Sequence, residues 1–138
     1  KIPLDLEIEL QRSYLEIEQA RYPDLSVEVS LPEEVREALV PSLILQPIVE
    51  NAVKYGVAAA PPNATVSIAA RADNGRLRLE VTDSGKGTSP QNGGSGIGLA
   101  NVRQRLALLY GEAASNLSAE RDANGRFRVE VTLPLELP

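Results

Sequence analysis

Apolar and polar residues follow two different periods along this chain, and the changes between them outline its elements. In Leu4–Tyr22 apolar side chains recur at helical spacing, as the following four show: Leu6, Leu10, Tyr14 and Ile17. The first residues also alternate as in a strand, but the length of the pattern favours a helix. Pro23 ends it, because proline cannot continue the helical hydrogen bonds. The spacing therefore predicts an amphipathic helix with one apolar stripe.

The most apolar segment, Pro41–Tyr55, predicts a second helix. Pro41 suits the first turn of a helix. Pro47 would then lie in the interior, where proline costs about 3 kcal/mol, and we expect it to kink or break the helix. Gly56 is expected just beyond the helix end, followed by a loop over residues 57–63.

Strict alternation predicts five strands. The first covers Leu25–Leu31 and precedes a short helical turn at 32–34. The others form two pairs, each joined around an Asn-Gly step, which is a strong hairpin signal: 65–70 with 76–82, and 116–121 with 126–133. Between the two hairpins, Leu99–Tyr110 has helical spacing and is stopped by Gly111.

This order of elements predicts an α+β fold. We expect a two-layer sandwich with a mixed, mostly antiparallel sheet covered by helices on one face, because the strands come in adjacent hairpins with helices between them. A doubly wound parallel sheet would instead alternate strand and helix throughout.

Composition excludes several function classes. The chain contains neither cysteine nor histidine, so it has no histidine general base and no zinc site built on those residues. Its net charge of -5 argues against binding nucleic acid, which requires a basic face. No apolar run approaches the roughly 18–20 residues of a membrane span.

A first cluster of candidate chemistry is Glu50–Gly56, at the end of the second predicted helix. An α-helix would place Asn51, Lys54 and Tyr55 on one face. An amide oxygen is a competent Mg²⁺ ligand, a lysine can meet phosphate, and a tyrosine ring offers a flat surface for a purine. A helix end with ordinary polar decoration would look the same.

Two glycine-containing clusters follow. The first, Asp83–Gly87, begins with a carboxylate at the end of a predicted strand, where it could accept a hydrogen bond from an exocyclic amine. The sequence Asp-Ser-Gly is also common in ordinary turns. The second, Gly93–Leu99, leads directly into a predicted helix, whose free N-terminal N–H groups could bind phosphate. The alternative interpretation of this segment is a flexible linker. Neither the P-loop nor the dinucleotide fingerprint fits.

In this order and spacing, the three clusters resemble the ATP-binding boxes of the GHKL ATPase superfamily. The match is closest to LytS-type sensor histidine kinases, through three stretches: Tyr14–Glu18 with Arg21, Pro41–Lys54, and Gly96–Arg103. The resemblance implies that residues 1–22 are the C-terminal part of a dimerisation and phosphoacceptor helix, and that 23–138 form the catalytic ATP-binding domain. It also implies ATP and Mg²⁺ as cofactors.

The resemblance also assigns roles to residues. Asn51 would bind Mg²⁺, Lys54 the phosphates, Tyr55 would lie against the nucleotide, and Asp83 would bind the adenine amine. The remaining nucleotide-binding positions would be Gly85, Gly87, Gly94, Ser95, Gly96, Ile97, Gly98 and Leu99. Residues 84–95 would form a mobile lid.

Two departures from the family pattern are visible. These kinases usually carry histidine where Tyr55 stands, although tyrosine is common in other histidine kinases. The phosphoacceptor motif, an Asn-Pro-His-Phe-type segment, is missing from the chain and is expected upstream of Lys1. The resemblance further implies a response-regulator partner, a homodimer in the full-length protein, and a cytoplasmic domain of a membrane-anchored sensor.

Three other functions share features of this pattern. Hydrolysing GHKL enzymes of the gyrase or MutL type place a glutamate one helical turn before the metal-binding asparagine, where this chain has Pro47. A nucleotide-binding regulatory module without catalysis would have the same boxes. An anti-sigma-factor-type serine kinase would share the fold, but the dimerisation-like helix at Leu4–Tyr22 argues against it.

Overall fold

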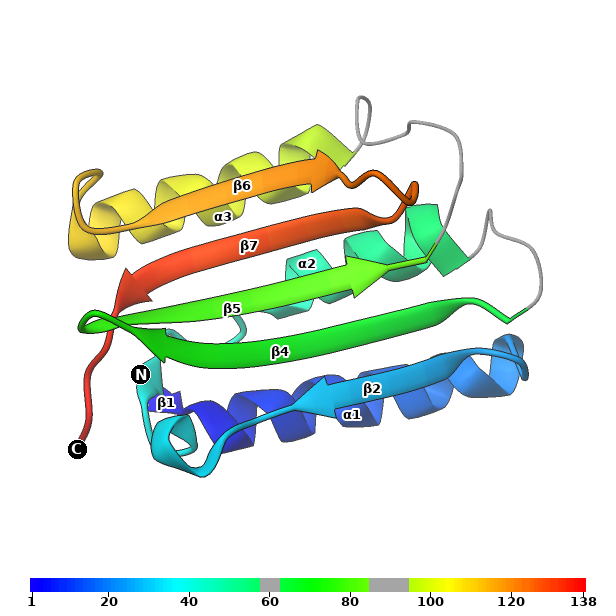
Figure 1. The fold of residues 1–138 in the computed structure, drawn as a ribbon, viewed down its shortest axis with the longest axis horizontal. Helices are drawn as coiled ribbons and strands as arrows, with labels where there is room; N and C mark the ends of the chain where they lie inside the picture. The colour runs from blue at the N-terminus through cyan, green and yellow to red at the C-terminus, as the bar shows by residue number, and fades with distance from the viewer. Residues whose placement is uncertain (58–62, 85–94) are drawn as a thin grey trace.

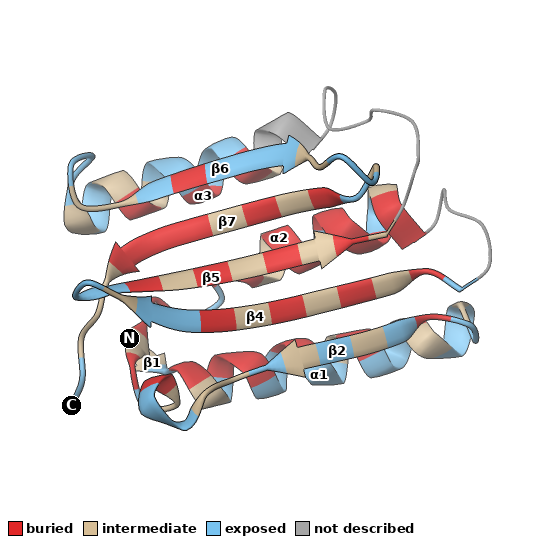
Figure 2. Ribbon diagram, in the orientation of Figure 1, coloured by how far each residue is buried: buried red, intermediate tan, exposed pale blue. Residues whose placement is uncertain are grey.

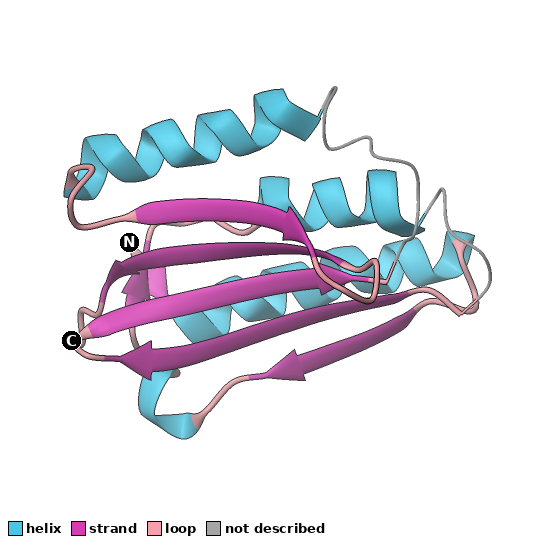
Figure 3. Cartoon of the chain, turned by 45° about the horizontal axis from the view of Figure 1, so that its top comes forward, coloured by secondary structure: helices cyan, strands magenta, loops and turns pink. Residues whose placement is uncertain are grey.

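A computed structural model of the chain describes residues 1–57, 63–84 and 95–138, and no side chain of 95–97. A five-stranded sheet forms one layer, and helices cover one of its faces (Figure 1 and Figure 3). Its strands are β2 (Ser26–Ser30), β4 (Thr65–Asp73), β5 (Arg76–Asp83), β6 (Asn116–Arg121) and β7 (Phe127–Pro134). The helices are α1 (Leu4–Arg21), α2 (Gln46–Asn51), α3 (Ser95–Tyr110), the 3-10 turn η1 (Glu33–Val35) and the π-helix η2 (Ala52–Val57).

The sheet has the order β2-β4-β5-β7-β6. Only β2 and β4 run parallel among these neighbours, and every other adjacent pair is antiparallel. The predicted α+β sandwich, with a mixed and mostly antiparallel sheet, is confirmed.

Both hairpins form where Asn-Gly predicted them. Asn74 and Gly75 have φ of 53° and 79°, and two successive residues with positive φ are what a two-residue hairpin turn requires. In the second hairpin the Asp122 carboxylate accepts hydrogen bonds from the backbone N–H groups of Asn124 and Arg126, at 2.8 and 3.0 Å. Residues within or next to each turn therefore stabilise both hairpins.

The period of two along the central strands separates the faces of the sheet (Figure 2). One set of side chains is buried against the helices: Val66, Ile68 and Ala70 of β4, Leu77, Leu79 and Val81 of β5, and Phe127, Val129, Val131 and Leu133 of β7. The alternate positions of β5 and β7 carry ion pairs instead, such as Arg78 with Asp73 at 2.8 Å and Arg128 with Glu120 at 2.9 Å. These partly exposed pairs contribute little stability, so the buried face provides most of it.

Helix α1 forms as predicted but buries a different stripe. Leu6, Leu10 and Ile17 of the expected stripe are 47%, 41% and 66% exposed. The buried positions are instead Leu4, Glu7, Ile8, Gln11, Leu15 and Glu18. Both stripes carry apolar residues at helical spacing, and the buried one includes three polar side chains, so apolar spacing alone does not identify the buried side of this helix.

The apolar residues of α1 share one hydrophobic core with the sheet. Leu4 and Leu15 are fully buried, and the N–H of Leu4 donates to the carbonyl of Ala38 at 2.8 Å. The assignment of residues 1–22 to a dimerisation helix stays a prediction. The structure adds that this helix also packs as part of the sandwich.

The second helix begins later than predicted. Residues 41–45 form a turn, α2 starts at Gln46, and Pro47 therefore lies in its first turn, where its missing N–H leaves no bond unmade. The chain then continues into η2, so Gly56 lies inside a π-helical turn and not beyond the helix end. The expected start at Pro41 and the expected interior kink at Pro47 were both wrong.

Two further boundaries differ from the sequence prediction. α3 begins at Ser95, four residues before the expected Leu99, so the glycine-rich box belongs to its first turn. The alternation also missed the two-residue strands β1 (Ile2–Pro3) and β3 (Leu39–Val40), which pair with each other outside the main sheet. Strands this short carry too few residues for a period to be visible.

Gln11 offers a test of how α1 packs. Its side chain is fully buried, and neither amide atom has a hydrogen-bond partner in the part of the chain that the structure describes. Replacing an unsatisfied amide by an apolar group of similar shape removes its desolvation penalty, so Gln11→Met should raise the free energy of unfolding by about 1 kcal/mol. Urea denaturation measures this change.

The matched control is Gln19→Met. Gln19 donates to the carbonyl of Leu25 at 3.0 Å, so the same substitution there removes a made hydrogen bond and should lower stability. Equal destabilisation by both substitutions would contradict the observed packing of α1.

Candidate functional site

Three elements that carry predicted site residues meet at one end of the molecule. β5 ends at Asp83, η2 ends at Val57, and α3 begins at Ser95, all at the right-hand end in Figure 1. α2 packs against α3, and η2 packs against β5. The site is therefore built from the helix-covered face of the sheet and the two helices nearest to it.

Asp83 is placed by the period of β5. It continues the buried set of Leu77, Leu79 and Val81 by one further step of two, so its side chain enters the covered face of the sheet and is only 3% exposed. The next residue is fixed as well, because Ser84 accepts the N–H of Thr65 on its Oγ at 2.8 Å and donates its own N–H to the Thr65 carbonyl at 3.0 Å. The end of β5 is thus held against the start of β4.

Gly56 lies directly against the Asp83 carboxyl group. A Cβ built on Gly56 would stand 2.3 Å from Cγ and 2.4 Å from Oδ1 of Asp83, far closer than any real contact. Only glycine lets the backbone of η2 approach the carboxylate this closely. Sequence reasoning assigned Gly56 to a helix end, and its closeness to Asp83 could not be read from the chain because 27 residues separate the two.

Asn51 is the last residue of α2 and is 8% exposed. Its amide oxygen is buried and has no hydrogen-bond partner among the described residues. An unsatisfied buried acceptor costs about 1–3 kcal/mol, which marks it as a position where a ligand can complete the bonding. The neighbouring Glu50 is exposed and accepts a hydrogen bond from Gln46 at 3.0 Å. The side chains of Glu50 and Asn51 therefore lie in different environments, one at the surface and one buried.

Lys54 and Tyr55 lie on η2 beyond Asn51. Lys54 is exposed and its Nζ is 5.3 Å from the centroid of the Tyr55 ring, within the range of a cation–π contact. Tyr55 is half-buried. Because a π turn contains more residues than an α turn, these side chains are rotated from the single face that an α-helical period predicted.

The glycine-rich box is described in part. The backbone of Ser95, Gly96 and Ile97 forms the first turn of α3; Gly98 is half-buried and Leu99 is buried. Gly85, Gly87 and Gly94, and with them nearly all of the predicted lid, lie outside the described residues. The structure thus brings together Asn51, Gly56 and Asp83, and places the box at the start of a helix that packs on α2.

The phenol of Tyr14 on α1 is half-buried. Burial raises its pKa, and the negative charges of Glu18 and Glu50 raise it further.

The chemistry of these residues fits a nucleotide with a divalent cation. A buried amide oxygen is a ligand that Mg²⁺ accepts, and Mg²⁺ is usually held by few protein groups together with substrate phosphates. No cluster of three histidine, cysteine, aspartate or glutamate side chains able to hold a metal occurs in the described residues. The carboxylate of Asp83 can accept a hydrogen bond from an amine.

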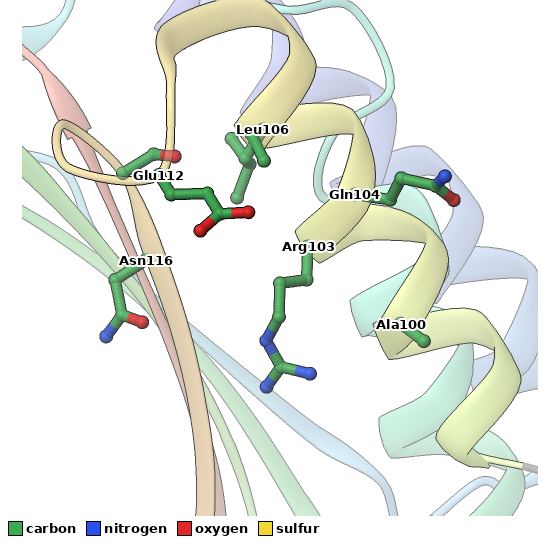
Figure 4. A pocket seen from close by; sticks show the side chains of 8 residues that line it. Ala100, Arg103, Gln104, Leu106, Glu112 and Asn116 are labelled. Atoms are coloured by element: carbon green, nitrogen blue, oxygen red, sulfur yellow. The ribbon is translucent and has the colours of Figure 1, made fainter.

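A separate hollow of about 520 Å³ opens between α3 and β6 (Figure 4). Arg103, Glu112 and Asn116 line it, and Arg103 donates to the carbonyl of Leu117 at 3.0 Å. Among the described residues, none of those predicted to bind nucleotide lines this hollow.

The contact of Gly56 with Asp83 makes a testable prediction. Gly56→Ala places a methyl group into the Asp83 carboxyl group and should lower the free energy of unfolding by about 1–3 kcal/mol, as overpacking does. In contrast, a Cβ on Gly98 of α3 meets no described atom within 4 Å, so Gly98→Ala should be neutral or stabilising by up to about 1 kcal/mol. Thermal denaturation compares the two; a stable Gly56→Ala protein would contradict the close approach.

Comparison with known proteins adds sequence relatives. The profile of the family described as histidine kinase-, DNA gyrase B-, and HSP90-like ATPase matches residues 38–137. Sensor histidine kinase BtsS of Escherichia coli (strain K12) is 34% identical over 129 residues, which are 93% of this chain and 23% of BtsS. Sensor protein LytS of Enterococcus faecalis is 30% identical over 148 residues, covering 98% of this chain and 25% of LytS. The chain spans about a quarter of the length of these relatives.

Solved structures share the fold. The catalytic domain of histidine kinase ThkA superposes with a TM-score of 0.74 at 16% identity, covering 98% of this chain and 96% of that domain. The mycobacterial sensor histidine kinase MprB gives a TM-score of 0.65 at 24% identity, with 95% of each chain covered. At such identities the likeness speaks for the fold alone.

The predicted resemblance to LytS and other sensor histidine kinases is thereby confirmed. Within the described ranges, no helix combines the length and the apolar character that crossing a bilayer requires. The fold, the matched profile and the sequence relatives agree, and the chain belongs to the family of histidine kinase-, DNA gyrase B-, and HSP90-like ATPases.

Proposed function

We propose that this chain binds Mg-ATP and is the catalytic domain of a two-component sensor histidine kinase. In this proposal it transfers the γ-phosphoryl group of ATP to a histidine outside the chain. The observation that carries it is the buried amide oxygen of Asn51, which has no hydrogen-bond partner among the described residues and lies on the helix that leads to the contact of Gly56 with Asp83. The sensor kinases among the relatives support the choice within the family.

Each residue has a role that follows from its place. Asp83, buried at the end of β5, accepts a hydrogen bond from the adenine amine, and Gly56 lets the backbone of η2 lie directly against that carboxylate. Asn51 offers its amide oxygen to Mg²⁺, which when bound neutralises phosphate charge during phosphoryl transfer. Lys54 is exposed and positioned to meet phosphate as a point charge. Backbone N–H groups of the first turn of α3 favour the phosphates from the other side.

The arrangement favours transfer over hydrolysis. One helical turn before Asn51 stands Pro47, which has no group that could activate water. Glu50 is exposed and bonded to Gln46, beside a buried Asn51. Phosphoryl transfer needs chiefly positioning and charge neutralisation, with the acceptor supplied by another segment. We therefore place this chain with the kinases and not with the gyrase- or MutL-type ATPases.

The proposal extends to the whole protein. The acceptor histidine would lie in a dimerisation segment upstream, the active protein would be a homodimer, and the phosphoryl group would pass to a response regulator. The domain would work on the cytoplasmic side of a membrane-anchored sensor. These expectations rest on the relatives, of which the chain covers about a quarter.

Two substitutions should separate the contribution of the adenine base to ATP affinity from the contribution of the metal ion. Asp83→Asn should weaken both ATP and adenosine binding by about 1.5–3 kcal/mol, the value of a hydrogen bond to a charged group. Asn51→Ala should weaken ATP binding only when Mg²⁺ is present and leave adenosine binding nearly intact. Titration calorimetry with and without Mg²⁺ measures each case. Unchanged affinity in Asp83→Asn would remove Asp83 from the site, and equal loss of ATP and adenosine in Asn51→Ala would make Asn51 a structural residue.

The absence of histidine makes a further prediction. Because the chain has no histidine, it should bind Mg-ATP without forming phosphohistidine on itself, and its hydrolysis of ATP should be slow. Incubation with γ-labelled ATP, with and without a dimerisation fragment of the full-length protein, tests this. Acid-labile label should appear on the added fragment alone. Rapid multiple-turnover hydrolysis by the isolated domain would assign it to the ATPases, and binding without any transfer would favour a regulatory module.

A further inference from the structure

A buried carboxylate on α1 holds the start of the helix that carries Asn51. Glu7 is fully buried. Its Oε1 accepts the backbone N–H of Leu43 and its Oε2 accepts that of Leu45, both at 2.8 Å. Both oxygens of one acidic side chain are thus used on a turn 36 and 38 residues further along the chain.

The turn that precedes α2 is stabilised by a residue distant in the sequence. Leu45, the N-cap residue of α2, makes no side-chain capping bond, and its own backbone N–H, just before the helix, is bonded to Glu7. Leu43 has a φ of 61°, a conformation that costs a residue with a Cβ roughly 1–2 kcal/mol and persists only where the surroundings enforce it. The bond from its N–H to Glu7 is part of that enforcement.

A second helix holds the same turn from the other side. Arg105 of α3 donates from Nη2 to the carbonyl of Ser42 at 2.8 Å. The turn of residues 42–45 is therefore fixed by α1 through Glu7 and by α3 through Arg105. α3 is the helix whose first turn contains the glycine-rich box.

A shift of this turn would be passed directly to Asn51. α2 has only six residues, so Asn51 lies less than two turns from Leu45, and a short helix moves as one body. Asp83 is held differently, since β5 is hydrogen-bonded along its length to β4 on one side and β7 on the other. The two halves of the site, metal ligand and base acceptor, thus depend on different supports.

We propose that Glu7 is a positioning residue that sets the place of Asn51, and that α1 is thereby coupled to metal-nucleotide binding. This inference rests on the proposed function, since it assigns Glu7 a role in Mg-ATP binding. It predicts that loss of the carboxylate affects the Mg²⁺-dependent part of nucleotide affinity and spares the part that depends on Asp83.

The test compares Glu7→Gln with Glu16→Gln, an exposed glutamate on the same helix. Glutamine keeps the length of Glu7 but has one acceptor in place of two. Calorimetry should show Mg-ATP binding weakened roughly tenfold in Glu7→Gln, which corresponds to about 1.4 kcal/mol, with adenosine binding changed less than about twofold. Glu16→Gln should leave both affinities unchanged.

A rescue variant distinguishes positioning from general stability. Leu43→Gly permits the positive φ without strain, so the turn no longer needs the bond from Glu7 to hold its shape. The double variant Glu7→Gln/Leu43→Gly should therefore recover most of the Mg-ATP affinity that Glu7→Gln loses. Absence of any recovery, or equal losses of Mg-ATP and adenosine affinity in Glu7→Gln, would overturn the inference.

An NMR experiment without nucleotide separates this inference from the proposed function. Glu7→Gln should shift the side-chain amide resonance of Asn51 and leave the backbone amide of Val81 in β5 in place. If the unaltered protein binds no Mg-ATP, the proposed function fails, while the Asn51 resonance still decides whether Glu7 positions that residue. An unmoved Asn51 resonance would refute the coupling even in a protein that binds Mg-ATP well.

Discussion

The two-residue period of the central strands is the constraint from which most of this structure follows. β4, β5 and β7 each place an unbroken apolar row on one face, and an apolar face of this size must be covered. α1, α2 and α3 cover it (Figure 3), which leaves the other face to ion pairs such as Arg78 with Asp73. The same period carries a carboxylate inward, because Asp83 is the next residue in the buried row of β5. A polar group thus enters the interface of sheet and helices at the edge of the core.

The helical segment that faces this carboxylate changes its type along its length. α2 changes into the π-helix η2 where it reaches the end of β5, and Gly56 in this turn touches Asp83. Isolated π turns often occur at functional sites, where they shift side chains from their α-helical positions. Here the change separates the surroundings of Asn51, Lys54 and Tyr55, which are buried, exposed and half-buried in turn. One element can therefore present an amide oxygen inside and a cation outside.

Buried polar groups on this side of the sheet fall into two kinds. The carboxylate of Glu7 has both oxygens bonded, and it fixes a turn, as a fully satisfied buried acceptor can. The amide oxygen of Asn51 and the amide of Gln11 have no bonded partner among the described residues. In the proposed function a ligand completes the bonding of Asn51, whereas Gln11 remains a cost to stability that an apolar side chain would remove.

By itself the sequence determined the fold class and both hairpins, and it located three candidate clusters, because these depend on local periods and on residues close together in the chain. It could not determine which stripe of α1 is buried. Leu6, Leu10 and Ile17 make the more apolar stripe, yet the buried stripe is the one that carries Glu7, whose carboxylate is bonded to Leu43 and Leu45. The late start of α2 and the contact of Gly56 with Asp83 have the same origin. Each depends on groups far apart in the chain, whose distances only tertiary packing decides.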